Sequence, residues 1–220
     1  MTNLFPYVQK MVELLTNEYY DLKYKKGAEY MIVTIGRQHG SNGREIAELL
    51  AKKLNVKCYD KEIVDEAANH SDFSRELIDS FDEKRMSALH LPVMSYGPNI
   101  NMQVVTAQFE TIESIADSGS CVFVGRCADY VLRNRQDVIK VFILGDMDAR
   151  IKTIAKRQGI SEQAAKKKIK EVDKDRSSYY RYYSEQVWGD AQNYDICINS
   201  SKLGVEKTVD VILSYINARE

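Results

Sequence analysis

The stretch Tyr30–Leu54, YMIVTIGRQHGSNGREIAELLAKKL, decides the fold that we expect for this chain. Its first part, Met31–Ile35, is a short apolar run rich in β-branched residues, which indicates a buried parallel strand. Gly36–Gly43 contains three glycines, so its backbone can reach positive φ and approach a ligand closely. Arg44–Leu54 spaces its apolar residues along one face of a helix. A strand, a glycine-rich loop and a helix form a phosphate-binding arrangement, because the loop N–H groups and the helix N-terminus direct positive charge at an anion.

The loop departs from the Walker A pattern, G-x-x-x-x-G-K-[ST]. In our interpretation, Arg44 provides the positive charge at the position of the lysine. Its guanidinium is a planar fork of donors, whereas the ammonium of lysine is a compact point charge. Glu45 then replaces the hydroxyl residue that would hold Mg²⁺. A carboxylate is also a legitimate Mg²⁺ ligand, but it brings negative charge near the phosphates. The alternative to a phosphate loop is a strand-to-helix turn whose glycines serve only tight packing.

Length and composition favour a single α/β domain. The chain has 220 residues, of which 44% are hydrophobic, and its formal net charge is −1, so no overall basic character predicts a nucleic acid or an anionic membrane as partner. No apolar run approaches the roughly 18 residues of a membrane span. The four cysteines are widely spaced and form no C-x-x-C pair, so free thiols are expected rather than a metal site. We therefore expect a cytoplasmic protein.

Strand and helix patterns alternate after the loop, which predicts a parallel sheet covered on both faces. The further strands are expected at Val56–Tyr59, Cys121–Val124, Val138–Leu144 and Asp195–Ile198. With Met31–Ile35 they make a five-stranded sheet in an α/β chain.

Three segments are expected to lie outside this core. Residues 1–29 predict a helical extension, and the apolar stripe of Phe5–Glu18 would pack on the domain or on a second copy of the chain, so a homodimer is left open. Residues from about 60 to 117 contain a helical insertion. Residues from about 160 to 190 are highly charged and show no apolar stripe after Ile169, so they predict a lid that is mobile without ligand.

Several charged residues fall where open α/β sheets bind ligands, at the carboxyl ends of strands. Asp60 and Arg126 each follow a predicted strand, whereas Arg176 and Arg181 lie in the charged segment. Phosphoryl transfer needs positive charge spread around phosphate oxygens, which these arginines could supply. The alternatives are a solvated strand end for Arg126 and a solvated helix face for the other two.

Two further features of the sequence could have a role in binding. His39 lies inside the glycine-rich loop, where it could contact phosphate or point into water. Tyr182, Tyr183 and Trp188 could stack on a base, but an aromatic cluster between helices is the more common arrangement, so we assign them no binding role.

An ordered series of motifs resembles the cytidylate kinase-like proteins, relatives of bacterial cytidylate kinases within the nucleoside monophosphate kinase branch of the P-loop fold. The motifs are GRQHGSNGREIAELLAKKL, YDKEI, VFVGRCADYVLRN, VFILGDMDARIKTIAKRQGISEQAA, DKDRSSYYRYY and WGDAQNYDICINSSKLG. They span roughly residues 30 to 218. The resemblance implies a P-loop NTPase three-layer sandwich, formed by residues 30–220, with a helical acceptor-binding insertion and a lid.

The resemblance also implies roles for individual residues. Donor phosphates would be bound by Gly36, Arg37, Gly40, Ser41, Asn42, Gly43, Arg44 and Glu45, with Glu45 as the metal ligand. The acceptor would be bound by Asp60, Arg126 and Asp129. The residues that act on the transferred group would be Arg44, Arg126, Arg176 and Arg181, with Asp173 near the last two.

The function implied is transfer of the γ-phosphoryl group of ATP, with Mg²⁺, to a small nucleotide, as in a nucleoside monophosphate kinase. Authentic cytidylate kinases carry a lysine and then a small or hydroxyl residue where this chain has Arg44 and Glu45. Two alternatives are therefore kept. The acceptor could be a nucleoside or another small metabolite, or the protein could be a nucleotide-binding regulator without turnover.

Overall fold

The computed structural model describes residues 31–80 and 99–219. The predicted helix Phe5–Glu18 lies outside this part of the chain, as does the middle of the predicted insertion, residues 81–98. Over the two described ranges, none of the helices combines the length and the apolar character that a membrane crossing requires.

Five parallel strands form one sheet in the order β2-β3-β1-β4-β5. The strands are β1 (Ile32–Arg37), β2 (Lys57–Tyr59), β3 (Cys121–Val124), β4 (Val138–Leu144) and β5 (Ile196–Asn199). The bounds predicted for β3 and β4 are confirmed, and the other three strands differ from their predicted bounds by one or two residues. β1 continues into Gly36 and Arg37 because both residues pair with β4, which a glycine-rich sequence does not suggest. The predicted α/β fold with a five-stranded parallel sheet is confirmed.

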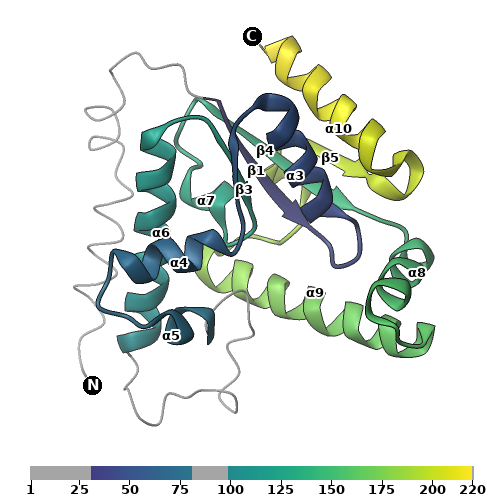
Figure 1. Cartoon of the computed structure of the whole chain (residues 1–220), viewed down its shortest axis with the longest axis horizontal. Coiled ribbons are helices and arrows are strands. Elements are labelled where there is room, and N and C mark those ends of the chain that lie inside the picture. Colours follow the sequence, from purple (N-terminus) through teal and green to yellow (C-terminus); the bar gives the residue numbers. More distant parts are fainter. Residues whose placement is uncertain (1–30, 81–98, 220) are drawn as a thin grey trace.

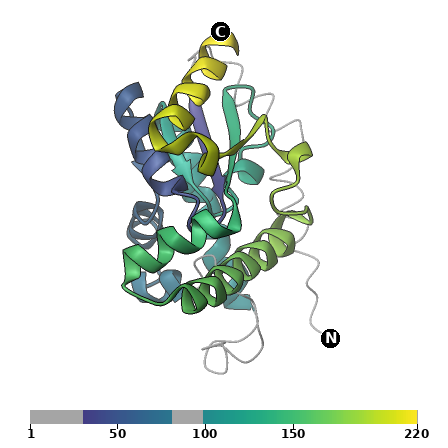
Figure 2. The same cartoon turned by 90° about the vertical axis from the view of Figure 1, so that its right-hand side faces the viewer.

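Helices cover both faces of this sheet (Figure 1). One face packs on α3 (Gly43–Leu54) and α10 (Ser200–Arg219), and the other packs on α4 (Glu62–Asn69), α6 (Asn99–Ser118) and α7 (Ala128–Val131). A short helix, α5 (Arg75–Ser80), packs against α4 and α6. The remaining helices, α8 (Met147–Gln158) and α9 (Glu162–Ser184), pack against each other. Figure 2 shows this pair from the side, below the sheet.

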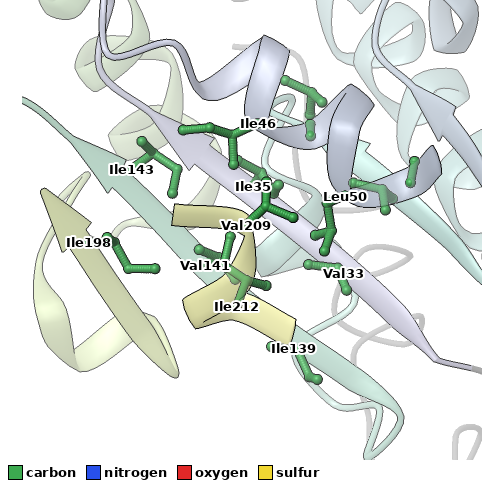
Figure 3. Close-up of a cluster of buried hydrophobic side chains, with 14 of the residues drawn as sticks. Val33, Ile35, Ile46, Leu50, Ile139, Val141, Ile143, Ile198, Val209 and Ile212 are labelled. Atoms are coloured by element: carbon green, nitrogen blue, oxygen red, sulfur yellow. The ribbon is translucent and has the colours of Figure 1, made fainter. Parts of the chain in front are cut away.

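The main core lies between the sheet and the pair α3 and α10. Side chains that alternate along β1 point to opposite faces, so Val33 and Ile35 enter this core while Ile32 enters the cluster under α4 and α6. From the helices, Leu50 of α3 and Ile212 of α10 enter the same cluster of buried side chains as these strand residues (Figure 3). The close packing of α3 on β1 fixes where the loop between them must turn.

Truncation of Ile212 tests this core. Ile212 is fully buried, whereas its neighbour Val211 on the same helix is 38% exposed. We expect Ile212→Ala to lower the free energy of unfolding by about 2–5 kcal/mol, because a buried isoleucine leaves a cavity. Val211→Ala should change it by no more than about 0.5 kcal/mol. Urea denaturation followed by circular dichroism measures both values, and equal losses would mean that α10 does not close the core.

Candidate functional site

The loop between β1 and α3 turns through two left-handed residues. Gly40 has φ 83° and Asn42 has φ 60°, a backbone conformation typical of concave anion-binding turns. Within the turn, the N–H of Ser41 donates to the carbonyl of Gln38 at 3.3 Å. Gly43 then begins α3. A Cβ atom at Gly43 would lie only 2.5 Å from the Cβ of Arg37, so this position accepts glycine alone. The first N–H groups of a helix have no partner within it, and here they face the loop, which is an anion-binding arrangement.

Hydrogen bonds from other elements hold the loop on the side of β4 and α10. The hydroxyl of Ser200 donates to the carbonyl of Ser41 at 2.7 Å. The N–H of Gln38 donates to the carbonyl of Ile143 at 2.9 Å, and the side-chain oxygen of Gln38 accepts from the N–H of Gly145 at 3.0 Å. The loop conformation is therefore determined by the ends of β4 and α10 as well as by its glycines.

Arg44 is the second residue of α3, and it extends toward the end of β2. Its Nε donates to Oε1 of Glu48 at 2.8 Å and lies 3.5 Å from Oδ2 of Asp60. The side chain is half exposed. These two contacts place the cation of Arg44 on the side of the loop where Asp60 lies.

Glu45 lies at the other side of the loop, against α8. Its Oε1 pairs with the guanidinium of Arg157, which also donates to Oδ1 of Asn42 at 3.2 Å. The second oxygen, Oε2, is buried and has no hydrogen-bond partner among the described residues. That oxygen fits a role as a metal ligand. Across residues 31–80 and 99–219, no group of three or more metal-ligating side chains exists, so Mg²⁺ would depend on this carboxylate together with phosphate oxygens and water.

Arg126 is buried at the end of β3, with only 2% of its surface exposed. Gly125, Arg126 and Cys127 all have positive φ, and consecutive residues in this sparsely populated region are typical of functional sites. The guanidinium donates to Oδ1 of Asp60 at 3.0 Å. The alternative of a solvated strand end is therefore wrong, and Asp60 joins Arg44 and Arg126 in one ionic network.

A small pocket lies beside these residues, at the carboxyl ends of β1 and β3. Three arginines line it: Arg37, Arg126 and Arg176. The guanidinium of Arg176 also donates to the carbonyl of Arg37 at 3.0 Å. The other lining residues are Gly36, Gly125, Cys127, Asp129, Tyr179, Tyr180, Trp188 and Tyr194. Arg181 does not line this pocket and is exposed on α9.

Asp129 forms part of the pocket wall and is 6% exposed. The hydroxyl of Tyr180 donates to its Oδ2 at 2.7 Å. Burial disfavours the charged carboxylate and raises the pKa of Asp129 from 3.8 to about 6, although the hydrogen bond from Tyr180 opposes this effect. Asp129 therefore keeps its proton to a higher pH than an ordinary aspartate does.

The second half of α9 has an apolar face, contrary to the sequence-based expectation for the segment after Ile169. Tyr179, Tyr180 and Tyr183 are buried there and pack with Trp188. Buried tyrosine rings contribute a large apolar area. They do not produce the periodic pattern of aliphatic residues that indicates a buried helix face in a sequence. Tyr182 remains 55% exposed. The preference for an aromatic cluster is confirmed for Tyr183 and Trp188.

His39 is partly buried beneath α9 and does not point freely into water. Burial is the main cause that lowers the pKa of His39 to about 4, and the charge of Arg176 adds to it. The backbone of His39 bonds to Asp173, which the resemblance places near Arg176 and Arg181, and to Arg150, which no motif assigns to the site. Arg150 belongs to α8 and Asp173 to α9, and their distance from the loop in sequence gives no signal of these two contacts.

The raised pKa of Asp129 predicts a pH dependence of stability. The folded protein holds this proton more tightly than the unfolded chain, so the contribution of Asp129 to the free energy of unfolding falls as pH rises from about 4 to about 6. Asp129→Asn keeps an oxygen for Tyr180 and cannot ionise. We expect its stability relative to wild type to increase by on the order of 2–3 kcal/mol between pH 4 and pH 7.5.

Urea denaturation of both proteins at the two pH values measures this difference. Asp148→Asn is the control, because Asp148 is exposed on α8. If Asp129→Asn shows the same difference from wild type at both pH values, the carboxyl of Asp129 does not ionise against burial.

Comparisons with known proteins identify the family of this chain. The model of the cytidylate kinase-like family matches residues 32–202. The cytidylate kinase of Methanosarcina mazei is 26% identical over 190 residues, which cover 86% of this chain and 97% of that kinase. The cytidylate kinase of Pyrococcus horikoshii is 26% identical over 189 residues, which cover 85% of this chain and 88% of the relative.

Solved structures show the same fold. An uncharacterized protein from Eubacterium ventriosum superposes with a TM-score of 0.69 at 34% identity, covering 86% of this chain and 99% of its own. Shikimate kinase from Bacteroides thetaiotaomicron has a TM-score of 0.52 at 12% identity, covering 85% and 98% of the two chains, and supports the kinase fold alone. Because the family model spans most of its length, the chain belongs to the cytidylate kinase-like family.

Proposed function

We propose that this protein transfers the γ-phosphoryl group of ATP, with Mg²⁺, to the phosphate of a nucleoside monophosphate, and that CMP is the first acceptor to test. The names of the relatives support a nucleotide kinase. The observation that carries the proposal for this chain is the cluster of Arg37, Arg126 and Arg176 beside the glycine-rich loop.

Phosphoryl transfer depends mainly on holding two phosphates in line and on neutralising the charge spread over their oxygens. The donor side of the site is the loop, whose curved backbone and helix N-terminus suit the phosphates of ATP. Glu45 has a buried oxygen available for Mg²⁺. Bound Mg²⁺ would neutralise charge on the donor phosphate oxygens.

The acceptor side lies between the ends of β2 and β3. Arg126 is buried and already ion-paired with Asp60, so its guanidinium is held in one orientation. An acceptor phosphate would approach this guanidinium and gain charge-assisted hydrogen bonds. Arg44 reaches the same Asp60, and we assign it to the acceptor side together with Arg126.

The segment from about 160 to 190, which contains α9, is proposed as the lid of this site, and α8 packs against it. Arg176 already lies in the pocket, and Arg181 is exposed further along the same helix. Closure of this segment over bound nucleotides would exclude water and bring Arg181 closer to the phosphates. Free nucleotides occur in the cytoplasm, and we propose that the protein acts there.

A direct test is a radiolabelled phosphate-transfer assay with ATP and Mg²⁺ and a panel of acceptors. The panel contains nucleoside monophosphates, nucleosides and small metabolites. We expect transfer to at least one nucleoside monophosphate. Transfer only to nucleosides or metabolites would show that the acceptor is not a nucleoside monophosphate. ATP binding without transfer to any acceptor would favour the regulatory alternative.

Arg126→Ala tests the acceptor side. We expect the dissociation constant for the acceptor to rise by roughly ten- to a hundredfold, since loss of a charge-assisted phosphate contact costs about 1.5–3 kcal/mol. The dissociation constant for ATP should change little. Isothermal titration calorimetry measures both, with Arg133→Ala as control, because Arg133 stacks on Tyr130 outside the pocket. Unchanged acceptor affinity in Arg126→Ala would remove Arg126 from the site.

A further inference from the structure

Side chains of α8 and α9 form hydrogen bonds with the backbone of the phosphate loop. Both peptide groups of His39 take part: its N–H donates to Oδ1 of Asp173 at 2.8 Å, and its carbonyl accepts from Nε of Arg150 at 2.8 Å. The guanidinium of Arg176 donates to the carbonyl of Arg37 at 3.0 Å. Three contacts from the helix pair thus act on the backbone of one short loop segment.

The two residues that hold His39 also hold each other. The guanidinium of Arg150 pairs with Oδ2 of Asp173, and the side chains are 4% and 19% exposed. Each charge is compensated at close range, so this pair is a rigid element rather than a free acid and a free base. The loop rests directly on α8, because a Cβ atom at Gly40 would lie 2.9 Å from the carbonyl oxygen of Arg150.

This arrangement divides the loop backbone into two parts. The N–H of His39 is committed to Asp173, so it is not available to a phosphate. After His39 the backbone turns through the left-handed residues Gly40 and Asn42, and the N–H of Ser41 donates to the carbonyl of Gln38 at 3.3 Å. The groups left for an anion are therefore those at the start of α3. Hydrogen bonds to both the N–H and the carbonyl of His39 restrict the backbone that follows it. A ligand then loses less binding free energy to ordering this backbone.

We propose that Asp173, acting through Arg150 and the backbone of His39, is a positioning residue for the donor phosphates. The inference rests on the proposed function and assigns to Asp173 no contact with the nucleotide. It also means that the base of the lid is attached to the phosphate loop in the free protein, so lid closure and donor binding are coupled through this contact.

The experiment measures the dissociation constants of the full chain for Mg²⁺-ATP and for CMP by isothermal titration calorimetry. Asp173→Ala removes the oxygen and the charge. Asp173→Asn keeps an oxygen for the N–H of His39 but loses the ion pair with Arg150. The control is Asp175→Asn, on the same helix. Thermal melting in each buffer confirms that every variant is folded at the assay temperature.

We expect Asp173→Ala to raise the dissociation constant for Mg²⁺-ATP by on the order of tenfold or more, the effect typical of a contact that orients a ligand-binding group. Asp173→Asn should give an intermediate value, and CMP affinity should stay within about twofold in both. A general structural defect would weaken both ligands together. Unchanged or tighter Mg²⁺-ATP binding in the Asp173 variants would overturn the proposal, and tighter binding would mean that the carboxylate competes with phosphate.

A measurement on the wild-type protein covers the case in which Asp173→Ala does not fold. The amide proton of His39 should exchange slowly with solvent, both free and with Mg²⁺-ATP bound, since Asp173 retains it in both states. Fast exchange in the free protein would overturn the proposal. If wild type binds no Mg²⁺-ATP at all, the proposed function fails, whereas normal binding with insensitive variants contradicts the role of Asp173 alone.

Discussion

The structure depends on how the peptide groups of the loop between β1 and α3 are satisfied. A loop that binds anions must leave several N–H groups without protein partners, while every other polar group of its backbone needs one. Hydrogen bonds from Ser200 and to Ile143 hold the loop on one side, and those from Arg150 and to Asp173 hold it on the other. The sheet, α3 and the helix pair meet at this loop for that reason.

The charged residues around the loop form matched sets rather than a uniform positive surface. Asp60 lies between Arg44 and Arg126, and Asp173 pairs with Arg150. Buried or partly buried arginines need such partners, because an uncompensated charge away from water is costly. The same pairing orients each guanidinium before a ligand arrives. Asp129 differs, since its partner is the neutral hydroxyl of Tyr180, and burial therefore raises its pKa.

The sheet could be predicted closely because each buried parallel strand is a short apolar run between glycines or charges. Cys121–Val124 and Val138–Leu144 have the expected bounds for this reason. The apolar face of α9 was not predicted, since it consists of tyrosines whose rings are buried in the folded chain. Gly43 shows another limit: the need for glycine there comes from the side chain of Arg37, a contact that no spacing rule contains.

The sequence by itself determined the fold class, the place of the phosphate loop, and the arginines that follow buried strands. Apolar periodicity and glycine positions are local properties, and they suffice for these conclusions. Only the tertiary structure decided which cation faces which side, and it placed Arg44 beside Asp60 and Arg176 beside Arg37. It also brought Asp173, 134 positions away in sequence, to the backbone of His39. These contacts depend on how α8 and α9 pack against each other and beside the loop, which the local sequence does not specify.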